Sequence, residues 1–561
     1  MQNSEKMDEL EFLANFDRIQ NEEERRENGK FYTPKLLVEL AHFKIAKCFG
    51  VDWKEHYAVW DNSCGTGNLT RGYRFRDLYL STNDEAELAH VKASKEGTAF
   101  SFDFLNDPIY ENAWLKTKSL LPETLWQVLR NDEPLMFFMN PPYAKGASYG
   151  TGAIKQTSVN KRMKALKMGQ GAANLYAQFI FRILEIKRHF NLTKCVLALF
   201  SPTLLFTGGS FSLLRKELFK DFNYLEAAIF SAKHFSDTAK HWAVGFSLWS
   251  SGSSRIRNNF PAKIIDWGPK QRLAVIGEKL LYNTDGAKPA NLWLREQTKG
   301  RMTMDAPNLT SALKIKQSGI RRGKSVEGAL GYFYSNSNNI EKNPINVALF
   351  SSPFSAGEGV SVIEENFERC VSLFAARKLV KNTWINNKDE YFAPNEEHEL
   401  WPEFVNDSTV FSLFHSASNQ SSMRQIRYKD EFWDIKNHFF FMSMNALREL
   451  ALAHANAAIL EDLKDDSERY VYQRIMASKL SVEAQNCYDF ACRIVRESFP
   501  YRRKIQEQKP ELHLNTWDAS WYQIKRLASE SMPDSLEGFK EVFASLSEKM
   551  LAMVYTIGFL R

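Results

Sequence analysis

Between residues 35 and 250 the sequence alternates short apolar runs with stretches of helical periodicity, and this alternation constrains the fold more than any other feature. Strand and helix repeated in this way predict a doubly wound, Rossmann-like α/β sheet, whose ligand site lies at the carboxyl ends of the strands. The predicted strands are 57–61, 78–82, 99–104, 135–140, 194–201, 225–231 and 243–250. The predicted helices are 35–49, 84–95, 111–130, 173–190 and 210–220.

Changes in this pattern divide the 561 residues into three regions. Residues 1–28 predict a charged N-terminal helical extension, and 29–255 form the α/β domain. Beyond a Ser- and Gly-rich stretch the alternation stops, so 256–561 are interpreted as a C-terminal α+β region. Within the α/β domain, 144–174 is rich in Gly and Lys and has no strand character; a connection of that length is either functional or disordered.

Composition excludes several classes of protein. A hydrophobic content of 44% supplies packed cores, and a net charge of +6 permits an anionic partner without demonstrating one. No segment approaches the length of a membrane span, and the six cysteines form neither a disulfide framework nor C-x-x-C metal pairs. We expect a cytoplasmic protein with no membrane association and no metal.

The segment "VWDNSCGTGNLT" (59–70) combines a strand, a Gly-x-Gly turn and a helix start. Gly65 and Gly67 let the backbone pass close to a ligand, and amides at the helix start can hold a carboxylate or phosphate. The third glycine of the dinucleotide motif and the Gly-Lys-Ser/Thr of a phosphate loop are both missing. The turn alone therefore indicates a ligand site of unspecified kind.

Two acids then follow at strand ends. Asp84, with Glu85 as the nearby alternative, can accept hydrogen bonds from ribose hydroxyls. Asp103 can accept from an exocyclic adenine amine while Phe104 or Leu105 packs the ring. Each acid alone is typical of a strand end or helix cap, but their succession after the Gly-x-Gly turn favours a nucleoside site.

The segment "MFFMNPPYAKG" (136–146) places an amide, two prolines and a phenol at the end of a buried strand. The Asn140 amide oxygen and the Pro141 carbonyl can accept hydrogen bonds from an aromatic amine and so favour its tetrahedral, nucleophilic form. Pro141 and Pro142 restrict the backbone, and Tyr143 offers a face for stacking a base. A base inside a duplex must be flipped out to reach such a pocket.

Together, "GKFYTP" (29–34), "DNSCGTGN" (61–68) and the Asn-Pro-Pro-Tyr box resemble the gamma-type DNA N6-adenine methyltransferases, which use S-adenosylmethionine. The group includes solitary enzymes and modification subunits of restriction systems. The resemblance spans about 28–250 and implies double-stranded DNA as substrate. It implies a cofactor site formed by Phe31, Tyr32, Thr33, Asp61, Gly65, Gly67, Asp84, Asp103 and Phe104. It also implies that the target adenine is surrounded by Asn140, Pro141, Pro142 and Tyr143.

Two details of the resemblance are looser. Asn62 stands where proline is common in the family, and we expect little consequence because the glycines carry the turn. A further aromatic late in the domain often packs the flipped base; Phe235 and Trp242 are the candidates, with simple packing as the alternative.

Basic segments suggest how DNA is held. Segments 319–325, 374–394 and 499–504 interleave Arg and Lys with aromatics and amides, which suits a target-recognition region, although each alone is typical of a solvated face. Between the catalytic box and the next helix, cationic side chains can close over a phosphate backbone. These are Lys145, Lys155, Lys161, Arg162, Lys164 and Lys167.

Several alternatives stay open. The same box methylates release-factor glutamine and some RNA bases, and it suits the cytosine N4 amine as well as adenine N6. A catalytically inactive DNA-binding protein is a further alternative. No nuclease motif with suitable spacing occurs, so a cognate restriction endonuclease would be a separate protein. The recognised DNA sequence and the oligomeric state are not predicted.

Overall fold

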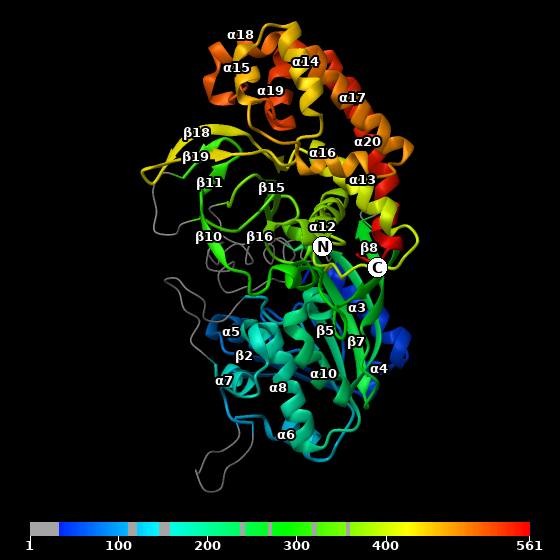
Figure 1. Ribbon diagram of the computed structural model, residues 1–561. Coiled ribbons are helices and arrows are strands. Elements are labelled where there is room, and N and C mark those ends of the chain that lie inside the picture. The colour runs from blue at the N-terminus through cyan, green and yellow to red at the C-terminus, as the bar shows by residue number, and fades with distance from the viewer. Residues whose placement is uncertain are drawn as a thin grey trace. The chain divides into compact units, whose positions relative to one another are not determined.

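The computed structural model describes residues 33–109, 120–144, 157–235, 242–267, 272–316, 323–354 and 359–561. It divides into two units (Figure 1). The N-terminal unit comprises the described residues up to Asp285 together with Thr383–Asp389, and the C-terminal unit comprises Gly286–Asn382 and Glu390–Arg561. The predicted helix over 1–28 lies outside the described residues, as do Phe31, Tyr32, Lys145 and Lys155.

A nine-stranded mixed sheet forms the centre of the N-terminal unit, in the order β3-β2-β1-β4-β5-β7-β6-β8-β9. Strands β3, β2, β1, β4 and β5 are parallel, and β7 runs antiparallel between β5 and β6. This is the predicted doubly wound, Rossmann-like α/β fold, and all seven predicted strands are present. The strands are β1 Ala58–Asp61, β2 Asp77–Thr82, β3 Thr98–Ser101, β4 Leu135–Met139, β5 Cys195–Pro202, β6 Phe222–Ser231, β7 Ala243–Ser251, β8 Asn259–Trp267 and β9 Leu273–Tyr282.

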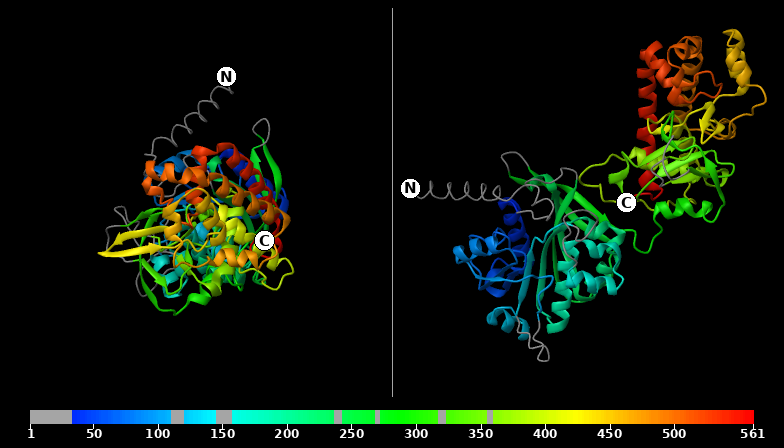
Figure 2. Two further views of the ribbon diagram at one scale, coloured as in Figure 1. Left: turned by 45° about the horizontal axis from the view of Figure 1, so that its top comes forward. Right: turned by 90° about the vertical axis from the view of Figure 1, so that its left-hand side faces the viewer.

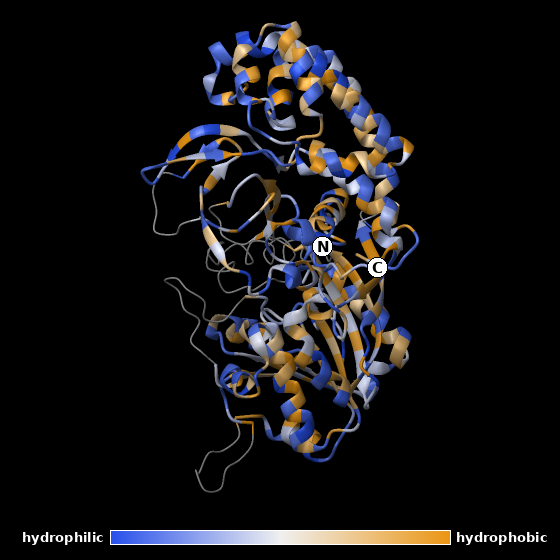
Figure 3. Ribbon diagram, in the orientation of Figure 1, coloured by the Kyte–Doolittle hydropathy of each residue, from blue (hydrophilic) through white to orange (hydrophobic). Residues whose placement is uncertain are grey.

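Helices cover both faces of this sheet (Figures 1 and 2). In β4 every side chain is buried, Met136 and Phe138 against one cluster and Phe137 and Met139 against the other. Such continuous apolar strands are expected of a sheet covered on both sides, and the central strands are hydrophobic in Figure 3. The helices are α3 Lys35–Phe49, α4 Trp53–His56, α5 Glu85–Ser94, α6 Glu123–Arg130, α7 Ser158–Ala165, α8 Leu175–Phe190, α9 Leu204–Thr207 and α10 Ser212–Asp221.

Two local predictions differ from the structure. The helix predicted over 111–130 begins at Glu123, directly after Pro122, whose fixed φ suits the start of a helix; residues 110–119 lie outside the described part. The strand predicted over 99–104 ends at Ser101. The residues after it therefore leave the sheet and line the pocket described below.

The two units divide at Asp285 and not near residue 255. Strands β8 and β9 extend the N-terminal sheet, and Asp285 pairs with the buried Arg215 of α10 at 2.8 Å. Thr383–Asp389 also belongs to this unit: Trp384 and Ile385 pack against its hydrophobic cluster, and Asp389 pairs with Lys279 at 2.6 Å. A third of the basic-aromatic segment 374–394, Thr383–Asp389, is thus part of the N-terminal unit.

The C-terminal unit is α+β, with small sheets followed by helices that include the long α20, red in Figure 2. Its largest sheet has the order β16-β14-β15-β17. The strands are β10 Thr303–Ala306, β11 Leu309–Ser311, β12 Lys314–Ile315, β13 Gly323–Val326, β14 Gly331–Ser335, β15 Val347–Phe350, β16 Gly359–Val362, β17 Ser418–Asn419, β18 Met423–Tyr428 and β19 Glu431–Ile435. The helices are α11 Ala290–Arg295, α12 Phe367–Leu379, α13 Trp401–Phe414, α14 Met444–Ala453, α15 Ala457–Asp462, α16 Tyr470–Met476, α17 Val482–Ser498, α18 Arg502–Gln508, α19 Trp521–Ser531 and α20 Pro533–Thr556.

Candidate active site

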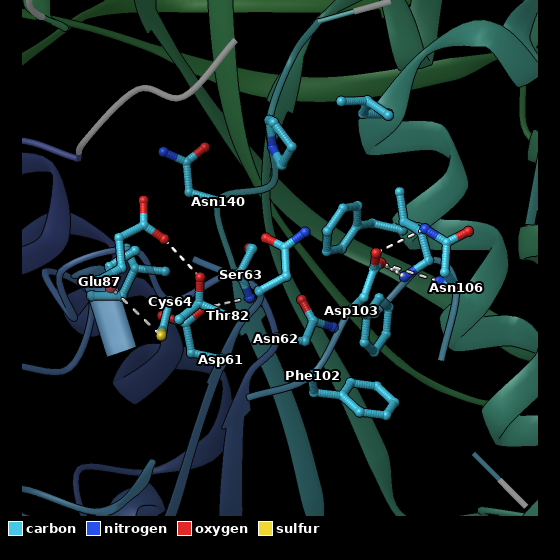
Figure 4. A pocket seen from close by; sticks show the side chains of 18 of the residues that line it. Asp61, Asn62, Ser63, Cys64, Thr82, Glu87, Phe102, Asp103, Asn106 and Asn140 are labelled. Atoms are coloured by element: carbon cyan, nitrogen blue, oxygen red, sulfur yellow. Dashed lines mark hydrogen bonds between the residues drawn. The ribbon is translucent and has the colours of Figure 1, made fainter. Parts of the chain in front are cut away.

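A cavity of about 540 Å³ lies at the carboxyl ends of β1, β2 and β4 and beside the residues that follow β3 (Figure 4). This is where the strand order reverses between β1 and β4, the usual ligand position in an open α/β sheet. The lining residues are Thr33, Asp61, Asn62, Ser63, Cys64, Gly65, Asn68, Leu69, Thr82, Asn83, Glu87, Phe102, Asp103, Phe104, Leu105, Asn106, Asn140, Pro142, Thr157, Leu175 and Phe179.

A tight turn leads out of β1 into this cavity. Gly65 and Gly67 both have positive φ, +53° and +82°, a region that a side chain would strain. The Gly67 N–H closes the turn by donating to the Cys64 carbonyl at 2.8 Å, and the Cys64 N–H donates to the Ser81 carbonyl of β2. The predicted Gly-x-Gly turn is therefore present, and Gly65 lines the cavity.

Three successive side chains in this turn carry buried polar atoms that have no hydrogen-bond partner among the described residues. They are Oδ2 of Asp61, both amide atoms of Asn62 and Oγ of Ser63. Burial raises the pKa of Asp61 to about 8, and the charge of Glu87 adds to this, while the Ser63 N–H partly offsets it. Buried polar groups are normally paired, so this concentration of unpaired atoms indicates a polar ligand.

Beyond β2, the carboxylate beside the cavity is that of Glu87, in the first turn of α5. It is 5% exposed and accepts a hydrogen bond from the Thr82 hydroxyl at 2.7 Å. Asp84 instead caps helix α5, accepting from the backbone N–H groups of Ala86 and Glu87. Asp84 is not among the residues that line the cavity. The predicted ribose contact of Asp84 or Glu85 stays a prediction, and the acid that borders the cavity, Glu87, was not selected from the sequence.

After β3, Asp103 lines the cavity and also organises its own loop. Its carboxylate accepts from the N–H groups of Leu105 and Asn106 and from the Asn106 amide, at 2.8–3.1 Å. Phe104 is buried and stacks on Phe179 of α8, with ring centroids 5.2 Å apart. An acceptor-rich loop beside aromatic rings suits a planar heterocycle with an exocyclic amine.

At the end of β4, the Asn140 amide is held from both sides. Its Nδ2 donates to the Thr33 hydroxyl at 2.9 Å, and its Oδ1 accepts from the Tyr143 hydroxyl at 2.6 Å. Burial raises the pKa of Tyr143 well above its usual value, so this hydroxyl stays a donor. The two bonds orient the amide beside the cavity.

Aromatic side chains surround Tyr143. Its ring makes edge contacts with Tyr176 and Trp242, at centroid distances of 6.3 and 5.8 Å. Phe235 is 2% exposed and packs in the hydrophobic cluster on the α3 face. Of the two aromatics proposed to pack a flipped base, Trp242 makes a ring contact with Tyr143 of the Asn-Pro-Pro-Tyr box.

The structure brings most of the predicted site residues into one cavity. Those that line it are Thr33, Asp61, Gly65, Asp103, Phe104, Asn140 and Pro142, whereas Gly67, Asp84, Pro141 and Tyr143 lie in the adjoining turns and do not. Residues that the sequence interpretation did not select also line it. Among these, Ser63 and Asn83 flank predicted residues, but Glu87, Thr157 and Phe179 reach the cavity from helices or from a distant segment and leave no local signal.

The basic segments are only partly exposed to solvent. Arg162 on α7 forms a two-pronged ion pair with Glu185 of α8, whereas Lys161, Lys164 and Lys167 are exposed. In segment 499–504, Arg502 is fully buried over the Phe499 ring. Arg321 and Arg322 lie outside the described residues.

A second cavity, of about 580 Å³, lies within the C-terminal unit. It is lined by the side chains of Lys378 and Lys381, by several amides and by aromatic rings, of which Phe350 and Phe354 stack at a centroid distance of 4.5 Å. Burial lowers the pKa of Lys378 to about 8, with a further contribution from Arg377. Segment 374–394 supplies the cations of this cavity.

In the part of the chain that the structure describes, no helix is both long and apolar enough to cross a bilayer. No cluster of three or more His, Cys, Asp or Glu side chains suited to a metal ion occurs among the same residues.

Comparison with known proteins finds no matching family model and no matching curated protein. Solved structures give weak matches. They include the type I restriction-modification methyltransferase subunit from Streptococcus thermophilus (16% identity, TM-score 0.29, covering 44% of this chain and 50% of that one). A modification subunit of a putative type I restriction enzyme from Vibrio vulnificus matches at 13% identity and TM-score 0.31, covering 64% of each chain. A DrdV–DNA complex matches at 17% identity and TM-score 0.31, covering 45% of this chain and 29% of that one.

In each of these three matches the aligned region spans less than two-thirds of the other protein's chain. Because the TM-scores are near 0.3, the fold assignment rests on the strand order, and the function rests on the geometry of the cavity.

Proposed function

We propose that the protein is a DNA methyltransferase that transfers a methyl group from S-adenosylmethionine to N6 of an adenine flipped out of double-stranded DNA. One observation carries the proposal. The Asn140 amide, oriented by Thr33 and Tyr143 at the end of β4, lines the cavity. The same cavity is lined by the residues after β1 that carry unpaired polar atoms and by the acceptor loop after β3.

The residues present fit S-adenosylmethionine. A volume of about 540 Å³ is in the range of small-molecule sites. Asp103 and the stacked Phe104 suit the adenine, Thr82 with Glu87 or Asp84 suits the ribose hydroxyls, and the unpaired atoms after β1 suit a charged group. When bound, the cofactor supplies a methyl group on a sulfonium centre, whose positive charge favours a nearby carboxylate such as Asp61.

The chain's own residues act on the acceptor amine. Asn140 Oδ1 and the Pro141 carbonyl accept the two N6–H hydrogen bonds, which localises the nitrogen lone pair without an ionised base. Tyr143 holds the amide and, with Trp242, offers aromatic faces to the base. The C-terminal unit, through the Lys378 and Lys381 cavity, contacts the DNA backbone. A cognate restriction endonuclease, where one exists, is a separate partner.

The decisive experiment incubates purified protein with unmethylated DNA and labelled S-adenosylmethionine, then sequences the DNA by a method that detects methyl groups directly. We expect N6-methyladenine at one recurring sequence. Asn140→Ala should lower transfer by about 10²–10³-fold or more with cofactor affinity unchanged within about twofold. Asn131→Ala, an exposed asparagine before the same strand, is the matched control and should retain activity.

Other outcomes separate the alternatives. N4-methylcytosine at the recurring sequence would mean that the acceptor base is cytosine and that the protein is still a DNA methyltransferase. Cofactor binding with no transfer to DNA would contradict a DNA substrate and direct the same assay to RNA and to a glutamine amide. Loss of cofactor binding in Asn140→Ala would mean that the assignment of the catalytic box is wrong.

A further inference from the structure

The side-chain amide of Asn62 has no evident role in holding the cavity together. Its side chain is 2% exposed and lines the cavity, and neither Nδ2 nor Oδ1 has a hydrogen-bond partner among the described residues. Figure 4 shows it with Asp61 and Ser63, which follow one another out of β1. Each of these two neighbours also carries one unpaired buried oxygen.

The turn itself does not require this amide. The turn is closed by backbone hydrogen bonds and by the positive φ of Gly65 and Gly67, and the Asn62 side chain contributes to neither. Leaving a buried amide unpaired costs stability. The absence of a structural role, together with this cost, indicates that the amide is satisfied by what enters the cavity.

The strand order identifies the part of the cofactor that reaches Asn62. Along the sheet edge the order is β4, β1, β2 and β3. These strands lead in turn to Asn140, to Asn62, to Thr82 with Glu87 of α5, and to the loop of Asp103. The transferred methyl must lie at Asn140, and the adenine suits the aromatic β3 end. The ribose then lies near β2, and the amino-acid head, which branches from the same sulfur as the methyl, lies at the β1 turn.

We propose that Asn62 recognises the amino-acid head of the cofactor, an inference that rests on the proposed function. The amide has a donor and an acceptor, and the head has a carboxylate and an ammonium group, so Nδ2 donates to the carboxylate and Oδ1 accepts from the ammonium. The adjacent Asp61 carboxylate balances the ammonium charge. Asn62 thus makes the turn selective for a ligand that carries the intact head.

The test compares two ligands by calorimetry. S-adenosylhomocysteine carries the head, and 5′-methylthioadenosine has the adenosine and thioether without it. Asn62→Leu should lower the affinity for S-adenosylhomocysteine about tenfold or more, because charge-assisted hydrogen bonds are removed. Its affinity for methylthioadenosine should stay within about twofold of the wild-type value. Glu87→Gln is the matched control. Because Glu87 lies on the proposed ribose side and both ligands contain the ribose, this variant should lower the affinity for both ligands equally.

A second readout distinguishes recognition from a structural role. Without ligand, Asn62→Leu should raise the thermal midpoint, since it removes a buried unpaired amide; a structural amide would lower it. Should Asn62→Leu fail to fold, Asn62→Asp keeps the size, loses the donor, and should show the same selective loss of S-adenosylhomocysteine.

Three results are decisive. Equal weakening of both ligands by the Asn62 variants, or no weakening of either, overturns the assignment of Asn62. Selective weakening supports it. Failure of the wild-type protein to bind S-adenosylmethionine, S-adenosylhomocysteine or methylthioadenosine instead refutes the proposed function, and the two failures are therefore distinguishable.

Discussion

The two cavities differ in how their buried polar groups are satisfied. In the C-terminal unit, Arg377 lines the cavity, yet its guanidinium donates to the Asn343 and Ser335 side chains and to three backbone carbonyls. In the N-terminal unit, Asp61, Asn62 and Ser63 leave four buried atoms unpaired. A fully paired buried charge is part of the architecture, whereas a run of unpaired buried groups that lines a cavity can be completed by a ligand.

The two cavities suit different ligands. The N-terminal cavity combines unpaired polar atoms with stacked rings, which suits one small, polar, aromatic molecule. The C-terminal cavity combines lysines with aromatic rings, which suits interaction with a polyanion. Variants in one cavity should therefore leave the affinity of the other cavity's ligand unchanged.

The largest effect is expected for Asp103→Ala. Removing the carboxylate deletes an acceptor for adenine and releases the Leu105–Asn106 loop that it holds, so cofactor affinity should fall about 10–100-fold. Calorimetry measures this, with DNA affinity as the internal control. An unchanged cofactor dissociation constant would refute the placement of adenine at β3.

The next effect is expected for the double variant Lys378→Ala and Lys381→Ala. DNA affinity should fall, and the slope of log affinity against log salt should lessen by about 0.9 for each phosphate that the protein no longer neutralises. Cofactor affinity should not change. Lys299→Ala with Lys314→Ala, both exposed in the same unit, makes the same charge change outside the cavity. Equal losses of DNA affinity in the two double variants would mean that the cavity lysines act only as part of a general basic surface.

A pH effect is expected from Asp61, whose pKa burial raises to about 8. Because the folded pKa lies above the unfolded value, the residue's contribution to stability is fully present at low pH and is lost as pH rises through about 8. A cationic cofactor favours the ionised carboxylate, so binding should release up to about one proton near neutral pH. Calorimetry in buffers of different ionisation enthalpy measures this, and Asp61→Asn should abolish the release.

The smallest effect is expected for Asp84→Ala. Loss of the cap on α5 should lower the free energy of unfolding by about 1 kcal/mol. If Glu87 and not Asp84 holds the ribose, cofactor affinity should stay within about twofold. Chemical denaturation measures the free energy of unfolding, and calorimetry on the same preparation measures cofactor affinity. A tenfold loss of cofactor affinity would mean that Asp84 binds the ribose.

Local sequence accounted for the elements and for the core of the site. Buried strands such as β4 are continuous apolar runs, and α3 was predicted with its observed bounds, Lys35–Phe49, because periodicity and chain breakers act over a few residues. The Gly-x-Gly turn and the Asn-Pro-Pro-Tyr box follow strands, so their place at the carboxyl edge of the sheet also followed from the sequence.

Tertiary structure alone decided the rest. Strand β9 is an edge strand on which Val275, Ile276 and Leu280 are exposed, so its place in the N-terminal sheet follows from its pairing with β8. Thr383–Asp389 joins the N-terminal unit through long-range packing. Thr33 orients Asn140 across 107 residues of sequence, and whether Glu87 or Asp84 borders the cavity depends on how α5 begins. The sequence by itself determined which chemistry the strand ends carry. Which side chains meet around it, and which buried atoms remain unpaired, arises only from contacts between segments far apart in the chain.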